Sequence, residues 1–441
     1  MHNRFYIFLI SLIAAFGGLL FGFDIAIFSG TIPFIQPYYG LSNAELGWTG
    51  SSLYVGCIIG ALITGYATDK FGRKLPLTIS AAIFMVSSIM MGMASSYNML
   101  IIWRIIAGVG VGAASMLSPL YIAEISPAAK RGKLVSINQL TIVLGILLAY
   151  FSNYMLADVE NNWRWMFVSG TVPSFLFLIT VFFVPESPRW LVSKGNLEKA
   201  NRILTRVLGS EDAAIEMRNM QLRKPTTQKG GFRDLIHHSV IGLVLIGITL
   251  AVFQQISGAN AVFFYAPLIF EKANMDVSNQ LFQQVLIGVI NLVFTVVAMQ
   301  LVDKVGRKKL MVGGSFLMAV WLVAIGICFQ YSLFSGYWLT SFVLLFIATY
   351  ATTLAPVTWV LISEIFPQKA RGLAVSIATV MLWASCFGLA YGFPVLIQAV
   401  APANTYFIFS GICVIYFFFL IRFVPETKGK TLEQFEMEVV H

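Results

Sequence analysis

The chain of 441 residues has few charged side chains. Asp, Glu, Lys and Arg make up 11% of it, whereas hydrophobic residues make up 58%. Soluble globular proteins carry about 25% charged residues, so the composition predicts a protein that crosses a membrane several times. The net charge of +9 does not indicate nucleic-acid binding, because the basic residues stand in short clusters between apolar runs, as in the loops of membrane proteins.

Cysteine and histidine are also scarce. The four cysteines are scattered through apolar runs with neither a metal-ligand spacing nor a disulfide framework. The four histidines stand at the two ends of the chain and in a central polar segment. The sequence therefore predicts no metal site and no cofactor. Because no set of nucleophile, base and orienting group is visible, we do not expect an enzyme.

A cleavable signal peptide is not indicated. The first apolar run, at about residues 5–32, is longer than the core of a signal peptide, and no clear small-residue cleavage site follows it. We interpret this run as the first membrane span.

Long apolar runs are abundant. About 20 apolar residues in a helix cross the hydrocarbon core of a bilayer. The runs that meet this requirement predict an all-α membrane protein with twelve transmembrane helices, at approximately 5–32, 47–68, 75–95, 99–125, 132–156, 163–184, 238–270, 278–302, 309–331, 338–365, 370–398 and 403–423.

Basic residues alternate along the loops. They follow the second, fourth, eighth and tenth runs, for example at Arg73, Arg131, Arg307 and Arg371, whereas the intervening loops hold few. Cytoplasmic loops of membrane proteins are enriched in Lys and Arg. Both termini are therefore predicted to be cytoplasmic.

The composition becomes polar between Val192 and Phe232, where apolar residues recur at a partly helical spacing. This segment predicts short amphipathic helices on the cytoplasmic face. The predicted domains are an N-terminal six-helix bundle at 1–190, a cytoplasmic helical linker at 191–235, a C-terminal six-helix bundle at 236–423 and a cytoplasmic tail at 424–441.

The two halves of the chain repeat each other. DKFGRK at 69–74 recurs as DKVGRK at 303–308, YIAEISP at 121–127 as LISEIFP at 361–367, and PES at 185–187 as PET at 425–427. Each repeated segment stands at a predicted cytoplasmic end of a span. Two parallel six-helix repeats with a site between them are the architecture of major facilitator transporters.

The seventh run contains the most unusual polar stretch, with Gln254, Gln255, Gly258 and Asn260. Amides are costly in hydrocarbon because they find no water there. In a water-filled cavity they offer donors and acceptors to a hydroxyl-rich solute, and Gly258 would let the helix bend. The alternative is that the amides only join one helix to another.

Taken with these motifs, this stretch and PESPRW at 185–190 resemble the sugar porter family of the major facilitator superfamily, from Gly17 to about Gly429. Within that family, the chain resembles proton-coupled xylose symporters of bacteria and facilitative hexose carriers of animals. The resemblance implies a sugar site formed by Gln139, Gln254, Gln255, Asn260, Asn291, Trp359 and Trp383. For the two tryptophans, packing or interfacial anchoring is the alternative.

Four positions depart from the pattern of the xylose carriers. Phe264, Ile146, Leu382 and Cys386 stand where that pattern has polar side chains. Four possible hydrogen bonds to sugar are thus missing, each contributing about 0.5–1.5 kcal/mol. Fructose, glucose, galactose, xylose and inositol all remain open as substrates.

Asp24 stands in an otherwise uncharged part of the first run. Carboxylates at the centre of a membrane are rare and usually functional. We predict that Asp24 binds and releases a proton, with Arg104 of the fourth run as its partner; the proton-coupled symporters have an aspartate here, whereas facilitative carriers usually do not. A permanent structural ion pair is the alternative.

Charged residues at the predicted cytoplasmic span ends are interpreted as a gate whose salt bridges, in this family, form when the carrier faces outward. As the alternative, they act only as topology signals and solvated helix ends. The predicted gate comprises Asp69, Arg73, Glu124, Arg131, Glu186, Arg189, Asp303, Arg307, Glu364 and Arg371.

The sequence thus predicts a carrier in a bacterial cytoplasmic membrane that imports a monosaccharide with a proton and works as a monomer. A proton-independent uniporter is the first alternative. A sugar sensor is a second, although sensors often add long cytoplasmic tails, and a drug exporter suits the amide-rich site less well.

Overall fold

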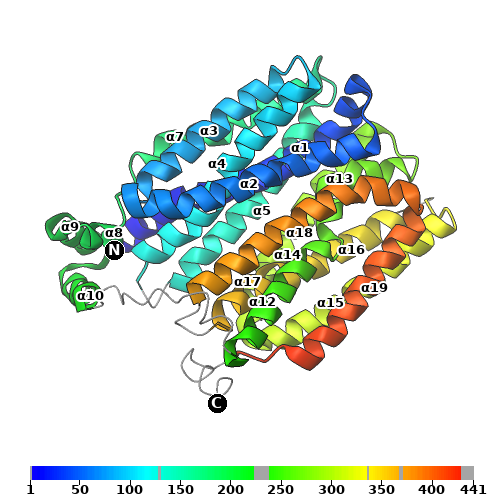
Figure 1. The fold of residues 1–441 in the computed structure, drawn as a ribbon. Coiled ribbons are helices and arrows are strands. Elements are labelled where there is room, and N and C mark those ends of the chain that lie inside the picture. The colour runs from blue at the N-terminus through cyan, green and yellow to red at the C-terminus, as the bar shows by residue number, and fades with distance from the viewer. Residues whose placement is uncertain (1, 128–130, 223–237, 335–336, 367–370, 429–441) are drawn as a thin grey trace. The chain divides into compact units, whose positions relative to one another are not determined.

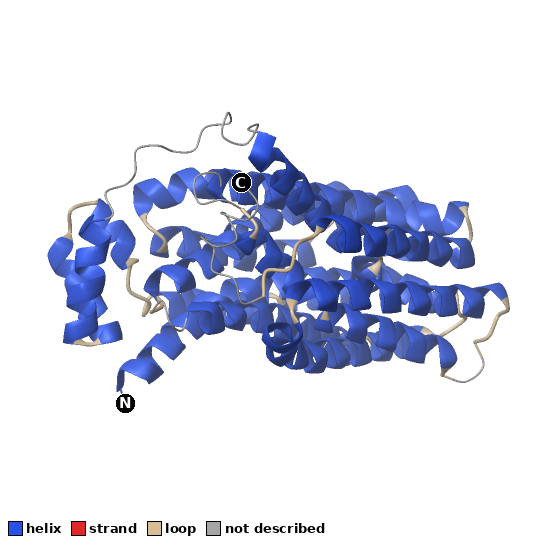
Figure 2. Cartoon of the chain, turned by 90° about the horizontal axis from the view of Figure 1, so that it is seen from below, coloured by secondary structure: helices blue, strands red, loops and turns tan. Residues whose placement is uncertain are grey.

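The computed structural model describes residues 2–127, 131–222, 238–334, 337–366 and 371–428. These residues form helices joined by short loops, and none of them lies in a strand (Figure 2). Twelve spans within them are long and apolar enough to cross a membrane. The predicted all-α fold with twelve transmembrane helices is confirmed, and the chain is an integral membrane protein.

The helices divide into two compact units. One consists of Met1–Phe28 and Ser52–Thr227, and the other of Ser29–Ser51 and Gln228–His441. The division falls inside α1 (His2–Tyr39) and α2 (Asn43–Phe71), so the adjoining ends of these two helices belong to the second unit.

The first unit also holds the helices up to residue 222 (Figure 1): α3 (Lys74–Gly92), α4 (Tyr97–Ile125), α5 (Arg131–Leu156), α6 (Asn162–Ser169), α7 (Thr171–Val181), α8 (Pro188–Ser193), α9 (Leu197–Leu208) and α10 (Ser210–Leu222). The sixth span is formed by α6 and α7 together. In the predicted linker, α9 buries Ala200, Leu204 and Val207 at helical spacing and leaves its charged residues outside. Helix α9 therefore has the amphipathic pattern that the sequence predicts for this segment.

Glycines allow close helix packing in the first unit, notably Gly108 and Gly112 of α4. A Cβ atom on Gly108 would lie 2.0 Å from the carbonyl oxygen of Leu53 on α2, and one on Gly112 would lie 2.3 Å from that of Cys57. A Cβ atom on Gly56 of α2 would likewise lie 2.0 Å from the carbonyl oxygen of Ile105 on α4. Since no side chain fits there, the backbones of α2 and α4 are in direct contact.

The second unit contains the remaining helices: α12 (His238–Ile256), α13 (Ala259–Glu271), α14 (Val277–Val305), α15 (Arg307–Gln330), α16 (Trp338–Thr352), α17 (Leu354–Glu364), α18 (Arg371–Ala399) and α19 (Pro402–Phe423). Helices α15 and α19 lie side by side (Figure 1). The segment Ser29–Ser51 is bonded to two of these helices. Gln284 Nε2 of α14 donates to Ser29 Oγ at 2.7 Å, and Asn43 Nδ2 donates to Gln398 Oε1 of α18 at 2.5 Å.

Two spans of the second unit are interrupted. The seventh is divided into α12 and α13 at Gly258, whose φ of +94° lies in the region that favours glycine. The tenth is divided into α16 and α17 at Thr353, with φ −119° and ψ −80°. Breaks in membrane helices are tolerated where other groups satisfy the freed backbone atoms, and the break at Gly258 agrees with the prediction of a bend.

Candidate functional site

A chain of amide hydrogen bonds lies beside the two helix breaks of the second unit. Gln254 Nε2 donates to the backbone carbonyl oxygens of Leu354 at 3.3 Å and Ala355 at 3.1 Å, in the first turn of α17. Gln255 Nε2 donates to Gln254 Oε1 at 3.3 Å, and Asn260 Nδ2 donates to Gln255 Oε1. Hydrogen bonds thus join the three predicted amides through Gln255, and their connection with α17 was not foreseen.

The amide chain is buried at one end and more open at the other. Gln254 is 3% exposed and Gln255 7%, whereas Asn260 is half-buried. Buried amides must be hydrogen-bonded to avoid a desolvation cost. The hydrogen bonds of the amide chain meet this requirement for Gln254, whereas polar atoms of Asn260 remain accessible.

Aromatic and apolar side chains complete this part of the second unit. Tyr265 Oη donates to the carbonyl oxygen of Ala390 at 2.6 Å, and the Tyr265 ring stacks on Phe393. Phe264, Leu382 and Cys386, three of the positions that depart from the xylose-carrier pattern, are buried. They therefore contribute apolar packing where polar side chains would add hydrogen bonds.

The other predicted sugar contacts differ in exposure. Asn291 of α14 and Trp383 of α18 are buried, whereas Trp359 of α17 is 40% exposed. Gln139 of α5 is half-buried and belongs to the first unit, as does the buried Ile146. Six of the seven predicted contacts thus lie in the second unit.

Asp24 and Arg104 are both fully buried in the first unit. Neither carboxylate oxygen of Asp24 accepts a hydrogen bond from the described part of the chain. The guanidinium of Arg104 acts on Asp24 electrostatically and lies over the ring of Phe28, 4.3 Å from its centre. A charged carboxylate in such surroundings is costly unless a cation compensates it, so the predicted partnership has a physical basis.

An ion pair and a capping carboxylate lie at one end of the first unit. Arg73 Nη2 contacts Glu124 Oε1 at 2.7 Å, with side chains that are 13% and 8% exposed. Glu186 accepts hydrogen bonds from the backbone N–H groups of Arg73 at 2.8 Å and Lys74 at 3.3 Å. Since α3 begins here, the carboxylate satisfies N–H groups that the helix cannot pair itself.

The second unit repeats this cap with a residue that sequence reasoning missed. Glu426 accepts from the backbone N–H groups of Arg307 at 3.0 Å and Lys308 at 3.2 Å, where α15 begins. The Lys74 and Lys308 ammonium groups also match, donating to the carbonyl oxygens of Phe182 at 2.6 Å and Ile421 at 2.9 Å. The repeat of PES as PET was the signal that could have identified Glu426.

The remaining residues of the predicted gate are placed only in part. Arg189 contacts Glu216 of α10 at 4.0 Å, a partner that was not predicted. The carbonyl oxygen of Asp69 accepts from Trp190 Nε1 at 3.2 Å. The side chains of Arg131, Asp303, Glu364 and Arg371 lie outside the described residues.

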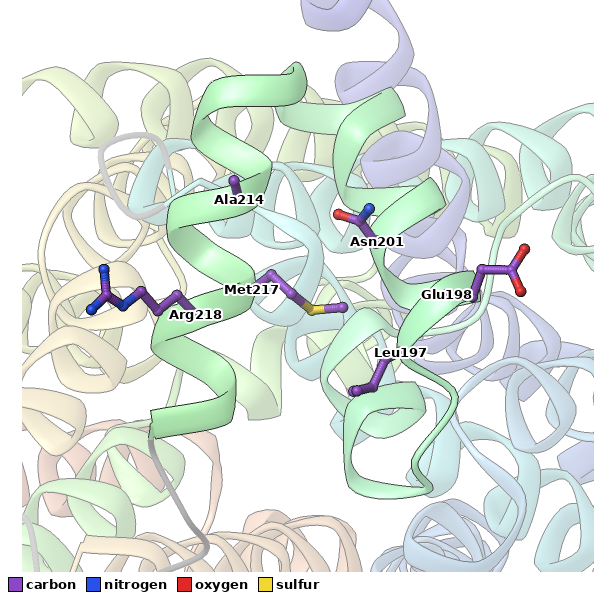
Figure 3. Close-up of a pocket in the computed structure, with 6 residues that line it drawn as sticks. All are labelled: Leu197, Glu198, Asn201, Ala214, Met217 and Arg218. Atoms are coloured by element: carbon purple, nitrogen blue, oxygen red, sulfur yellow. The ribbon is translucent and has the colours of Figure 1, made fainter.

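A hollow of about 450 Å³ lies between α9 and α10 at the surface of the first unit. Met217 points toward α9, whereas Arg218 points away from it (Figure 3). The hollow is lined by Leu197, Glu198, Asn201, Ala214, Met217 and Arg218. None of these belongs to the predicted sugar or proton sites.

Known proteins resemble this chain along nearly its whole length. The family described as "Sugar (and other) transporter" matches residues 10–438. The arabinose-proton symporter of Bacillus subtilis is 39% identical, over 99% of this chain and 95% of that protein. The D-xylose-proton symporter of Escherichia coli K12 is also 39% identical, over 99% and 96%.

A solved structure is also similar to this chain. The inward-open conformation of the xylose transporter XylE from E. coli matches with a TM-score of 0.87 and 37% identity, covering 98% of this chain and 100% of that one. The parallel six-helix repeats expected from the sequence are those of this fold. The chain belongs to the sugar porter family of the major facilitator superfamily.

Proposed function

We propose that this protein imports a monosaccharide together with a proton by alternating access. The observation that carries the sugar assignment is the chain from Asn260 through Gln255 to Gln254, which holds uncharged amides at a helix break inside a membrane span. Amides bond hydroxyl groups without the cost of a buried charge. The arabinose and xylose symporters among the relatives support a pentose or hexose as the substrate.

The proposed sugar site comprises Gln139, Gln254, Gln255, Asn260, Asn291, Trp359 and Trp383. The tryptophan faces suit the C–H side of a sugar ring, and the indole N–H donates a hydrogen bond. Phe264, Leu382 and Cys386, which stand where the xylose-carrier pattern has polar side chains, are buried and offer a sugar few hydrogen bonds. The preferred sugar therefore makes fewer hydrogen bonds here than in the xylose carriers.

The proposed proton carrier is Asp24, with Arg104 as the cation that modulates it. The burial of both side chains and the lack of hydrogen bonds to the Asp24 oxygens from described residues support this role. Proton entry contributes about 2.3 kcal/mol per 100 mV of membrane potential, which is enough for substantial accumulation of sugar. The ion pair of Arg73 with Glu124 supports a gate that includes the charged residues of the repeated cytoplasmic segments.

The proposal includes a bacterial cytoplasmic membrane, cytoplasmic termini and a functional monomer. The proposed domains are an N-terminal bundle at 1–190 and a C-terminal bundle at 236–423. The linker at 191–235 joins the two bundles, and the tail at 424–441 follows the second. The basic loops support this orientation.

The test is a measurement of external pH in lightly buffered, de-energised vesicles while D-xylose, L-arabinose, D-glucose, D-galactose, D-fructose and myo-inositol are added one at a time. We expect alkalinisation with at least one sugar and none in Asp24→Asn. Equilibration of a labelled sugar without a pH change and without sensitivity to a protonophore would instead establish a uniporter. Absence of saturable uptake for every sugar would overturn sugar transport.

A further inference from the structure

We propose that Gln254, which the proposed sugar site includes, acts in that site as a positioning residue: it takes its orientation from the break between α16 and α17 and thereby decides which atoms of Gln255 and Asn260 face the sugar. This inference rests on the proposed function. It gives the amide chain a direction, and the direction determines which hydroxyl groups the site accepts.

The backbone carbonyl oxygens of Leu354 and Ala355 determine the direction of the amide chain, because they can only accept hydrogen bonds. Because the Gln254 amide lies within 3.3 Å of both, its nitrogen must face them and its oxygen must point away. Gln255 must then present its nitrogen to Gln254 and its oxygen to Asn260. One fixed amide therefore orients the other two.

Threonine hydroxyl groups hold the Leu354 carbonyl and the break itself in place. Thr358 Oγ1 donates to the Leu354 carbonyl at 2.8 Å, and Thr353 Oγ1 donates to the carbonyl of Thr349 at 2.6 Å. Helix α15 supports the break through Gly314, where a Cβ atom would lie 2.1 Å from Thr353 Oγ1. The position of the break thus depends on a glycine of another helix.

The α12 end of the amide chain is equally constrained. Ser257 Oγ donates to the Gln254 carbonyl at 3.0 Å, and the Ser257 carbonyl accepts from Cys413 Sγ at 3.6 Å. Gly258 packs on the Phe409 ring, to which a Cβ atom would come within 3.2 Å. These contacts fix the backbone on which Gln254 and Gln255 stand.

The consequence concerns the open end of the chain. Asn260 donates one of its two N–H groups to Gln255, which leaves its oxygen to accept a hydrogen bond from a sugar hydroxyl and its second N–H group to donate. Gln255 keeps one N–H group to donate. A hydroxyl group can donate to Asn260, whereas a fluorine atom at the same carbon cannot. The site therefore selects a neutral polyol with a donating hydroxyl at this position.

The experiment compares Gln254→Met with the matched control Gln280→Met. Gln280 is another buried glutamine of the second unit, and its Nε2 donates to the carbonyl oxygen of Met275 at 2.8 Å, apart from the amide chain. Uptake of labelled D-glucose, or of D-xylose if glucose is not taken up, is measured in proteoliposomes. The competitors are the monodeoxy and monodeoxyfluoro analogues of that sugar.

In the wild type we expect one ring position at which the deoxy and deoxyfluoro analogues both bind about 2- to 10-fold more weakly than the parent sugar, because neither donates. In Gln254→Met the two remaining amides can turn, so Asn260 can offer its nitrogen to fluorine. The deoxyfluoro analogue should then gain at least about twofold over the deoxy analogue, whereas Gln280→Met keeps the wild-type ratio.

A second pair of variants leaves all three amides intact. Gly314→Ala displaces Thr353 and should shift the same ratio, whereas Gly313→Ala, with no atom within 4 Å of its added Cβ, should not. This pair decides the question if Gln254→Met does not fold. An unchanged ratio in Gln254→Met or, failing its expression, in Gly314→Ala overturns the positioning role alone. A wild type that takes up no monosaccharide overturns the proposed function and this inference with it.

Discussion

The carboxylate of Glu186 accepts a hydrogen bond from the backbone N–H group of Arg73 at 2.8 Å, across 113 positions of the chain. Glu426 makes the equivalent bond to Arg307 at 3.0 Å, across 119 positions. In each unit, a glutamate that follows the sixth span of its repeat thus caps the helix after the second. The internal repeat therefore preserves a tertiary contact as well as a sequence motif.

Removing either cap should destabilise the protein by a similar amount. Loss of a capping side chain costs about 0.5–2 kcal/mol, because the N–H groups at the start of the helix lose their acceptor. Glu186→Ala and Glu426→Ala are each expected to lower the midpoint of thermal unfolding in detergent. Glu198→Ala is the control, since Glu198 pairs with Arg202 at 2.9 Å while both are strongly exposed, and its effect should be negligible. An equal effect in the control would contradict the capping role.

The pair of Arg73 and Glu124 should show strong coupling. Both side chains are mostly buried, so Arg73→Met leaves a carboxylate without its cation, which costs about 3–5 kcal/mol. Arg73→Met combined with Glu124→Gln removes both charges and should cost less than the sum of the single substitutions. A double-mutant cycle of unfolding free energies measures the difference. Additive effects would show that the two charges act independently.

The sequence predicted the features that have a local signature. Apolar length identified the twelve spans, and Gly258 marked the bend that divides the seventh. The break at Thr353 was not predicted. Its φ of −119° can be adopted by any residue type, so the break needs no glycine that would mark it in the sequence. The bonds from Gln254 to Leu354 and Ala355 could not be predicted either, since a bond to a backbone carbonyl leaves no trace in the identity of the accepting residue.

Two glycines of α2 should respond oppositely to alanine. At Gly56 an added Cβ would lie 2.0 Å from the carbonyl oxygen of Ile105, so Gly56→Ala must push α2 and α4 apart. Overpacking of this kind costs about 1–3 kcal/mol. At Gly65 no atom lies within 4 Å of the added Cβ, so Gly65→Ala should be neutral or stabilising by up to about 1 kcal/mol through helix propensity. Thermal unfolding of the two variants tests the packing, and equal midpoints would contradict it.

Asp24→Asn should separate sugar movement from proton movement. The amide keeps the size of the side chain and removes its charge, so Arg104 loses the carboxylate that attracts it while its contact with Phe28 can persist. We expect energised vesicles to lose most accumulation of a transported sugar, because an amide cannot carry a proton across. Exchange of labelled for unlabelled sugar at equal concentrations should persist, because it needs no net proton transfer. Loss of exchange together with accumulation would instead indicate that Asp24 holds the structure of the first unit, and full accumulation at neutral pH would assign the proton to another residue.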